Sequence, residues 1–553
     1  MRHQYRFTLS AATAIVVVMA CILALGLGRD HRKATALRPR PRPAQQSPVQ
    51  VTTSQYGNAR TGADLNETVL SPQNVNQNQF GKVFTFQVDG GVYAQPLYLP
   101  RLAIPGQGIH NVLFIATEHD SVYAFDADGN STDPLWRSSL LGPGETTLSA
   151  SDVSCGFISP EVGITGTPVI DPATGTLYVL ARTKNNSAGS GPFFAQRLHA
   201  LDVTTGAEKL GGPVLIQATV AGAGAGSSSG QLGFDPLMEN PRAGLLLANQ
   251  NIYITWASSC DVGAYHGWVI AYNAQTLAQV GVFNDSPNGN RGGIWLGDAA
   301  PAADAQGNVF LATGNGDFDA KSGGPDYGDS VIKLQTSASG LSVADYFAPF
   351  NQQHLDDADL DLGSSGAVLL PDLPGTHPHV LVLSGKGGVL YVIDRDAMGK
   401  FHAKNDNHAV DAKQIGNEGF GAPAYWNNHV YIALEGDNLK SFAVKANGRL
   451  SRNPVSVSPS SFGNRGCTPT VSANGNAGGV VWVIENTGTG SPAVLHAFDA
   501  ANVANELYNS QHNSGRDSAG NGLRFTIPTV AQGRVYVGTA GEVDVYGLIS
   551  PSR

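Results

Sequence analysis

The most regular feature of the chain is a short apolar stretch that recurs eight times between residues 111 and 539. Each copy follows turn residues and has an aromatic or branched residue near its centre. Continuous apolar runs of this length are typical of strands buried on both faces. The copies are Asn111–Thr117, Gly175–Ala181, Gln250–Trp256, Gly307–Thr313, Pro378–Ser384, Asn428–Leu434, Gly479–Glu485 and Gly533–Thr539.

A second strand-like stretch follows each copy, and in several of them apolar and polar residues alternate. A short Pro-containing stretch precedes many copies, and turn residues lead on to a fourth, outer stretch. Four strands repeated in this way form the blade of a propeller. We therefore predict an all-β protein, an eight-bladed β-propeller of four-stranded antiparallel blades. The alternative of two separate sandwiches is disfavoured by the eight matched strand pairs.

The two ends of the repeat region predict how the ring closes. The eighth repeat ends at Leu548 and leaves no later stretch in the chain for its outer strand. Before the first repeat, Lys82–Asp89 reads KVFTFQVD, which is a suitable strand. We expect this N-terminal strand to complete the eighth blade, because an incomplete blade would expose an unpaired edge.

The N-terminal residues predict a membrane signal. Thr8–Gly28 is almost wholly apolar, and about 20 such residues span a bilayer. It is either a cleaved signal peptide or a signal-anchor helix. We divide the chain into residues 1–28 (signal or anchor), 29–50 (an Arg/Pro-rich linker) and 51–549 (the propeller). More Lys and Arg follow the apolar run than precede it, which by itself would favour a cytoplasmic body.

Composition narrows the classes of partner. The chain of 553 residues carries a net charge of −10, which argues against nucleic acid. Contact with a membrane is expected only through the N-terminal segment, and the protein is expected to be a monomer. No Cys-x-x-Cys-His motif occurs, so no c-type haem is expected.

Several motifs resemble those of the pyrroloquinoline-quinone (PQQ)-dependent alcohol dehydrogenases. The opening residues Tyr56–Arg60, YGNAR, resemble the start of that family's propeller. In the fourth repeat, Gly292–Trp295 and Leu311–Gly316 resemble the blade that carries the cofactor. In the fifth, Asp359-Leu360-Asp361 and the stretch from Ser384 resemble the segments with the catalytic aspartate and a quinone-contacting basic residue.

The resemblance implies specific roles. Trp295 would stack on the quinone, Asn315 and Asp359 would bind Ca²⁺, Asp359 would act as the catalytic base, and Lys386 would contact the quinone. It also implies a secreted or periplasmic body, anchored in the membrane if residues 8–28 are retained. In an antiparallel blade the start of the innermost strand and the turn between the second and third strands lie at one end. That geometry independently places these residues at one mouth of the channel.

The chain also departs from the family. The vicinal cysteine pair that covers the quinone is absent, and Lys184–Gln196, where a calcium-binding Glu is expected, contains no acid. Tyr93 stands where another Glu is expected. Two classes of function therefore remain open. One is a PQQ-dependent alcohol or sugar dehydrogenase. The other is a non-catalytic propeller that binds a protein or saccharide through an acidic channel mouth.

Two further groups belong to the same predicted mouth. Cys155 precedes the second blade and Cys260 follows the second strand of the third, so we expect a disulfide between them. Acidic residues also fall in turns there, and we favour solvated turn residues over a ligand site for each of them. They are Glu118, Asp120, Glu161, Asp261, Asp317, Glu435 and Glu485.

Overall fold

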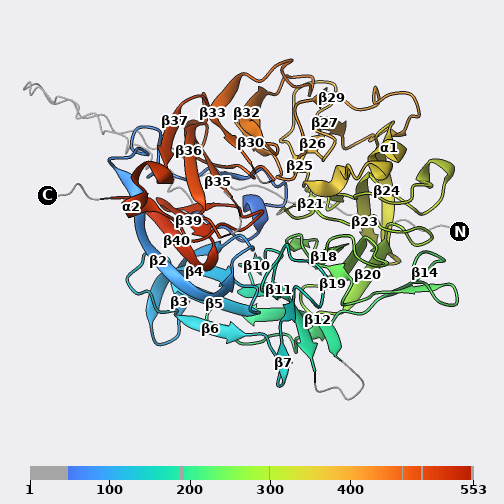
Figure 1. Ribbon diagram of the computed structural model, residues 1–553, viewed down its shortest axis with the longest axis horizontal. Helices are drawn as coiled ribbons and strands as arrows, with labels where there is room; N and C mark the ends of the chain where they lie inside the picture. The colour runs from blue at the N-terminus through green and yellow to red at the C-terminus, as the bar shows by residue number, and fades with distance from the viewer. Residues whose placement is uncertain are drawn as a thin grey trace, which may run out of the picture. The chain divides into compact units, whose positions relative to one another are not determined.

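The described residues form ten sheets, of which eight are blades that follow one another in chain order around a central axis (Figure 1). The computed structural model describes residues 48–186, 192–297, 299–463, 465–486, 488 and 490–549. The predicted all-β, eight-bladed propeller is confirmed. The apolar stretch Thr8–Gly28 lies outside the described residues. Among those described, no helix is long and apolar enough to cross a membrane.

The first four blades each contain four antiparallel strands, numbered from the axis outward. Blade 1 comprises β3 (Leu97–Ile104), β4 (Gly108–Ala116), β5 (Ser121–Asp126) and β6 (Trp136–Ser139). Blade 2 comprises β10 (Val169–Asp171), β11 (Thr176–Asn185), β12 (Phe193–Asp202) and β13 (Val214–Leu215). Blade 3 comprises β17 (Leu246–Ala248), β18 (Asn251–Ser258), β19 (Trp268–Asn273) and β20 (Gln279–Asn284). Blade 4 comprises β21 (Ala302–Ala303), β22 (Val309–Ala312), β23 (Val331–Ser337) and β24 (Gly340–Ala348).

The last four blades repeat the same order. Blade 5 comprises β25 (Val368–Leu369), β26 (Val380–Ser384), β27 (Val389–Asp394) and β29 (Asp411–Gln414). Blade 6 comprises β30 (Ala424–Trp426), β31 (His429–Ile432), β32 (Asp437–Ala443) and β33 (Ser456–Phe462). Blade 7 comprises β34 (Thr470–Asn474), β35 (Ala477–Glu485), β36 (Val494–Asp499) and β37 (Glu506–Asn509). Blade 8 comprises β38 (Thr529–Ala531), β39 (Arg534–Gly538), β40 (Ala540–Leu548) and β2 (Phe80–Gly91).

Short elements decorate the blades. The additional strands are β1 (Ala63–Asp64), β7 (Glu145–Thr146), β8 (Leu148–Ser149), β9 (Glu161–Val162), β14 (Thr219–Ala221), β15 (Gln231–Gly233), β16 (Glu239–Asn240) and β28 (Lys400–Phe401). The α-helices are α1 (Gln352–Asp357) and α2 (Ser514–Asp517), and the 3₁₀ helices are η1 (Ser54–Tyr56), η2 (Ala320–Ser322), η3 (Leu362–Ser364) and η4 (Ser510–Asn513).

The middle strands of the blades carry the apolar runs and form the core. In blade 3, all of β18 except its first residue is buried, and Ile254 pairs with Ile270 of β19. At the end of the same pair, Trp256 lies opposite Trp268, and both side chains are fully buried. Neighbouring blades cover both faces of such strands, which is why these runs are apolar at successive positions.

The strand before the first blade pairs with the last strand of the chain. β2 runs antiparallel to β40 in blade 8, with Phe80 opposite Leu548 and Phe86 opposite Val543. The stretch Lys82–Asp89 lies within β2. Phe80 is fully buried against Trp482 of blade 7, with ring centroids 5.3 Å apart.

Residues 51–62 bind the innermost strand of every blade. Backbone or side-chain hydrogen bonds join this segment to Tyr98, Ile170, Leu247, Ala303, Leu369, Tyr425, Val471 and Val530, one residue from each blade in turn. Only a segment on the axis can reach all eight. Arg60 within it is fully buried and donates to the carbonyl of Pro301 and the hydroxyl of Thr53. The segment therefore fills the centre of the ring beside the innermost strands.

Candidate functional site

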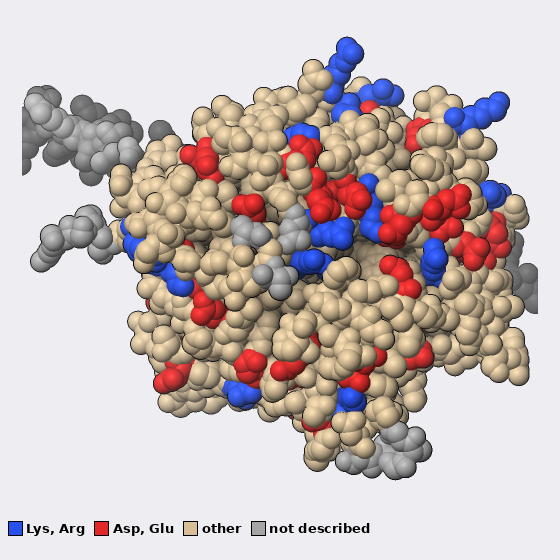
Figure 2. Space-filling view, viewed as in Figure 1, with Lys and Arg blue, Asp and Glu red and all other residues tan. Residues whose placement is uncertain are grey.

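A cavity lies at the ends of the blades where the innermost strands begin. Its volume is about 510 Å³, in the range typical of small-molecule sites. Its walls come from residues before the innermost strands of blades 2 to 8 and from the turns after β18 and β26. Figure 2 shows basic and acidic side chains side by side around a hollow near the middle of one face.

Trp295 lines this cavity, as the resemblance implies. Its ring meets that of Tyr265 edge to face, with centroids 6.2 Å apart. Its Nε1–H is buried and has no hydrogen-bond partner. The close neighbour is Gly314, where a side-chain carbon would lie 2.8 Å from Nε1 of Trp295 and 2.1 Å from Oδ1 of Asp361. Gly314 therefore allows blades 4 and 5 to bring Trp295 and Asp361 together.

Asp359, Asp361 and Lys386 also line the cavity. Asn315 is buried and contacts both aspartates. The ammonium of Lys386 is 2.6 Å from Oδ2 of Asp361 and 3.1 Å from Oδ1 of Asp359. Asn315 donates from its side chain to Asp359, 2.7 Å away, and from its backbone N–H to Asp361, 2.8 Å away. The four residues thus form one hydrogen-bonded group, although only three of them line the cavity.

Exposure separates the two aspartates. The side chain of Asp361 is 6% exposed and that of Asp359 is 71% exposed. Asp359 also has a φ of 56°, in the left-handed region that aspartate and asparagine adopt more readily than most other non-glycine residues. Asp359 is therefore the carboxylate that is open to the cavity.

The charge on Lys386 is well supported. Burial by itself disfavours the ammonium, but the charges of Asp361 and Asp359 and the hydrogen bonds to them outweigh it and raise the pKa of Lys386. Nearby, burial raises the pKa of Asp261, which also lines the cavity and accepts a hydrogen bond from the hydroxyl of Tyr265.

Three arginine–phenylalanine pairs complete the wall. Each guanidinium lies over a ring, and the distances from its central carbon to the ring centroid are 4.0, 4.5 and 4.5 Å. Such contacts contribute roughly 0.5–2 kcal/mol each. The pairs are Arg242 with Phe525, Arg465 with Phe420 and Arg524 with Phe157.

The sequence analysis missed these arginines. Arg242, Phe420 and Phe525 each stand four residues before the innermost strand of a blade, at Leu246, Ala424 and Thr529. Comparison of equivalent positions in the eight repeats would have grouped Arg242 with Phe420 and Phe525, but not with Arg465 or Arg524, which stand five residues before their strands.

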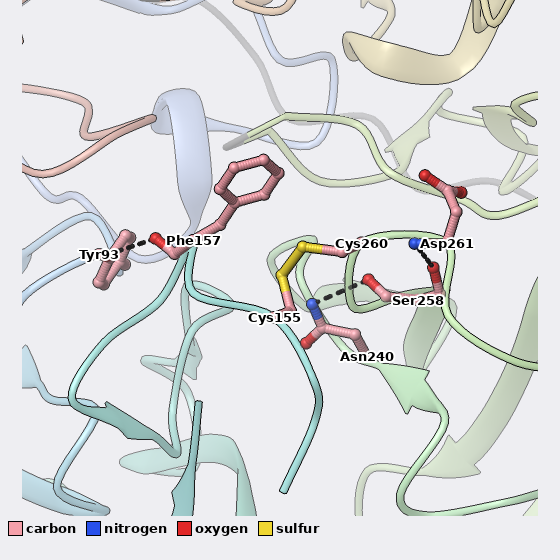
Figure 3. Close-up of a disulfide and its surroundings, with 7 residues drawn as sticks. All are labelled: Tyr93, Cys155, Phe157, Asn240, Ser258, Cys260 and Asp261. Carbon is pink, nitrogen blue, oxygen red and sulfur yellow. Dashed lines mark hydrogen bonds between the residues drawn. A yellow bond between two sulfur atoms is a disulfide. The ribbon is translucent and has the colours of Figure 1, made fainter. Parts of the chain in front are cut away.

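Cys155 and Cys260, the pair expected from the sequence, form a disulfide that lines the cavity (Figure 3). Their Cα atoms are 5.6 Å apart. The bond joins the segment before blade 2 to the turn after β18 of blade 3. Next to it, Asp261 donates its backbone N–H to the hydroxyl of Ser258, 3.0 Å away.

The acidic residues expected at the mouth do not form a ring of ligands. Asp261 is the member of that set that lines the cavity. Glu118 and Asp120 are 2% and 0% exposed, so their expected role as solvated turn residues is wrong. The segment before blade 2 covers them. Glu118 accepts hydrogen bonds from the backbone of Gly163 and the hydroxyl of Thr165, 2.6 and 2.8 Å away.

The donor set does not suit a calcium ion. Calcium takes about six to eight oxygen ligands. Here the inner oxygens of Asp359 and Asp361 already contact the ammonium of Lys386. Among the described residues, no group of three or more His, Cys, Asp or Glu side chains could hold a metal. The charged side chains that line the cavity are evenly divided between basic and acidic: Arg242, Lys386, Arg465 and Arg524, and Asp261, Asp359, Asp361 and Glu418.

Comparison with solved structures places the fold. A quinohemoprotein alcohol dehydrogenase from Pseudomonas putida HK5 matches with a TM-score of 0.58 at 14% identity, over 91% of this chain and 81% of that one. A europium-containing methanol dehydrogenase matches with a TM-score of 0.59 at 12% identity, over 91% and 99%. No protein-family model and no curated protein matches the chain. At these identities the likeness shows the fold, a propeller like those of the two dehydrogenases.

Proposed function

We propose that the protein binds a planar, carboxylate-bearing quinone of the PQQ type in its cavity and oxidises an alcohol or sugar hydroxyl there. One observation carries the proposal. Trp295 precedes the innermost strand of blade 4, whereas Asp359 and Lys386 come from two separate segments of blade 5, yet all three line the same cavity. A cavity that only stabilised the fold would have no need of this combination of an aromatic ring, an exposed carboxylate and a buried cation.

The residues of the wall suit such a ligand. The indole of Trp295 offers a stacking face, and offset stacking contributes about 0.5–1.5 kcal/mol beyond burial of area. Arg242 and Arg524 supply positive charge for carboxylates, and Lys386 offsets part of the negative charge of Asp359 and Asp361. The disulfide lies in the same wall as a compact apolar surface.

The exposed side chain of Asp359 indicates which protein group would take part in the reaction. A bound quinone would supply the chemistry of hydride acceptance from the alcohol carbon. The exposed carboxylate of Asp359 is placed to accept the hydroxyl proton. Asn315 and Lys386 hold its Oδ1, which leaves the rest of the carboxylate turned to the cavity.

Two variants separate binding from chemistry. Trp295→Ala should weaken PQQ binding about 5- to 150-fold, which corresponds to the 1–3 kcal/mol of a lost stacking surface. Asp359→Asn should leave binding within a few-fold and abolish dye-linked oxidation of alcohols and sugars, because asparagine tolerates the left-handed backbone but cannot act as the base. Retained turnover in Asp359→Asn would contradict the role assigned to this carboxylate.

A second function is supported by a different observation. Phe157 at the mouth is 51% exposed and lies beneath Arg524, a surface suited to a saccharide or protein partner. In that case the propeller is a non-catalytic binding protein. Phe157→Ala would then abolish partner binding, whereas Trp295→Ala would leave it unchanged.

We also propose that the propeller lies outside the cytoplasm, secreted or in a periplasm, with residues 8–28 as its signal or anchor. The disulfide supports this, because such bonds persist in oxidising compartments. The test is thiol labelling of protein that is taken directly from cells into denaturant. Cys155 and Cys260 should resist labelling until a reductant is added. Labelling of both cysteines without a reductant would contradict the proposal.

A further inference from the structure

The ammonium of Lys386 occupies the position between two carboxylates that a metal ion would need. It lies 2.6 Å from Asp361 and 3.1 Å from Asp359, while Asn315 holds the same two residues from the other side. The side chain of Lys386 is only 14% exposed. The cation at the centre of this group is therefore part of the chain itself.

The backbone holds Lys386 in this place. Its N–H donates to the carbonyl of Asp361, 2.9 Å away. A side-chain carbon at the preceding Gly385 would lie 2.6 Å from the same carbonyl, so only glycine allows the turn to approach so closely. Gly388 closes the turn with a φ of 67°. The amine is thus positioned by the turn after β26 and not by a flexible side chain alone.

The electrostatic balance favours the amine over a divalent ion. Each carboxylate contributes one negative charge, and Lys386 neutralises half of the pair with hydrogen bonds to both. A divalent ion placed between the aspartates would meet the ammonium within a few ångströms, and like charges at that distance repel strongly at low dielectric. To bind, it would have to expel a buried, hydrogen-bonded cation.

We propose that Lys386 takes the place of a divalent cation at this site, so that ligand binding in the cavity requires no calcium. The chain's own charge then orients Asp359, whereas positive charge for a negatively charged ligand comes from Arg242 and Arg524 in the same cavity. The part of this inference that concerns the ligand rests on the proposed function, whereas the part that concerns the metal stands without it.

The first test measures calcium binding in the absence of any quinone. Thermal unfolding is compared in millimolar Ca²⁺ and in EDTA. The wild-type protein should show the same unfolding temperature in both. Lys386→Ala should be stabilised by Ca²⁺, because Asp359 and Asp361 then face an empty cation position beside the buried Oδ1 of Asn315, which has no hydrogen-bond partner. Lys386→Arg, which keeps the charge, should not respond.

A lanthanide locates the ion. Tb³⁺ bound beside Asp361 would lie near Trp295. Excitation of Trp295 should therefore sensitise the emission of Tb³⁺ in the Lys386→Ala protein. The wild-type protein should show no such emission. Adding Trp295→Phe should remove the signal. Lys440→Ala is a matched control, because Lys440 is 17% exposed, is also paired with an aspartate, Asp437, and lies far along the chain in blade 6. That variant should gain no response to either ion.

The results of these metal-binding experiments test the inference about Lys386 independently of the proposed function. It is overturned if wild-type protein is stabilised by Ca²⁺ and Asp361→Asn abolishes the effect, or if Lys386→Ala gains no calcium response. In the ligand arm, PQQ should bind equally in EDTA and in Ca²⁺, and binding only with Ca²⁺ would also overturn it. Absence of PQQ binding in both buffers defeats the proposed function instead, and the calcium arm then decides this inference alone.

Discussion

The side-chain amide of Asn315 donates to Oδ1 of Asp359 across 2.7 Å, which joins the turn after β22 of blade 4 to the segment before β25 of blade 5. The backbone N–H of Asn315 also binds Asp361. The candidate site is thus built across a blade boundary. Its geometry depends on how closely these two segments approach, and Gly314 is the residue that permits it.

Gly314→Ala should disrupt the site while most of the fold survives. The added carbon would lie 2.1 Å from Oδ1 of Asp361 and 2.8 Å from Nε1 of Trp295, so both must move. Overpacking of this kind costs typically 1–3 kcal/mol, which denaturant unfolding will measure. Gly233→Ala is the control, because nothing lies within 4 Å of the added carbon there. Equal stability of the two variants would contradict the close contact at Gly314.

Glu118 should make stability depend on pH between about 4.5 and 7. Burial raises the pKa of Glu118 from 4.5 to about 7, against the opposing hydrogen bonds from Gly163 and Thr165. The folded protein therefore keeps a proton that the unfolded chain loses. Stability is fully present below pH 4.5, falls as pH rises towards 7 and is flat above it, a loss of about 3 kcal/mol from this group.

Glu118→Gln should remove that part of the decline. Urea unfolding at a series of pH values measures it. Asp64, whose pKa burial raises to about 7, contributes in the same direction and remains in the variant. A Glu118→Gln protein whose stability falls as steeply as that of the wild type would contradict the assignment.

Two truncations should separate the axial segment from β2. A chain that begins at Glu67 loses residues 51–62 and their bonds to all eight innermost strands, but keeps β2. It should stay monomeric and unfold at a lower temperature. A chain that begins at Val92 also loses β2, which exposes the edge of β40, and it should aggregate. Light scattering distinguishes them, and a soluble, cooperative second product would contradict closure of the ring by β2.

The repeat pattern predicted the blades because the middle strands, which are buried on both faces, carry the apolar stretches that recur along the chain. Gly307–Thr313 contains β22, and Pro378–Ser384 contains β26. The mouth was harder to predict. Trp295, Asp359 and Lys386 could be placed there from blade geometry, since each precedes an innermost strand or follows a second strand. Arg242 and Arg524 also precede innermost strands, but no family motif marks them, and their contacts with Phe525 and Phe157 depend on loop conformations.

The repeat pattern also could not predict which individual turn residues are buried. Glu118 and Asp120 occupy a turn, where carboxylates are usually solvated, but a neighbouring blade's loop covers them. Likewise, the amine of Lys386 sits between Asp359 and Asp361 only because two turns of blade 5 meet. Such contacts depend on tertiary structure alone.

The most direct test of the account is a calorimetric titration of PQQ into the purified full-length protein, in EDTA and again in Ca²⁺. The cavity with Trp295, Lys386 and the arginines predicts one PQQ per chain with a dissociation constant on the order of micromolar or tighter. Trp295→Ala should weaken it in the same buffer. No binding at tens of micromolar PQQ in either buffer would contradict the quinone site and leave the propeller as a binding scaffold.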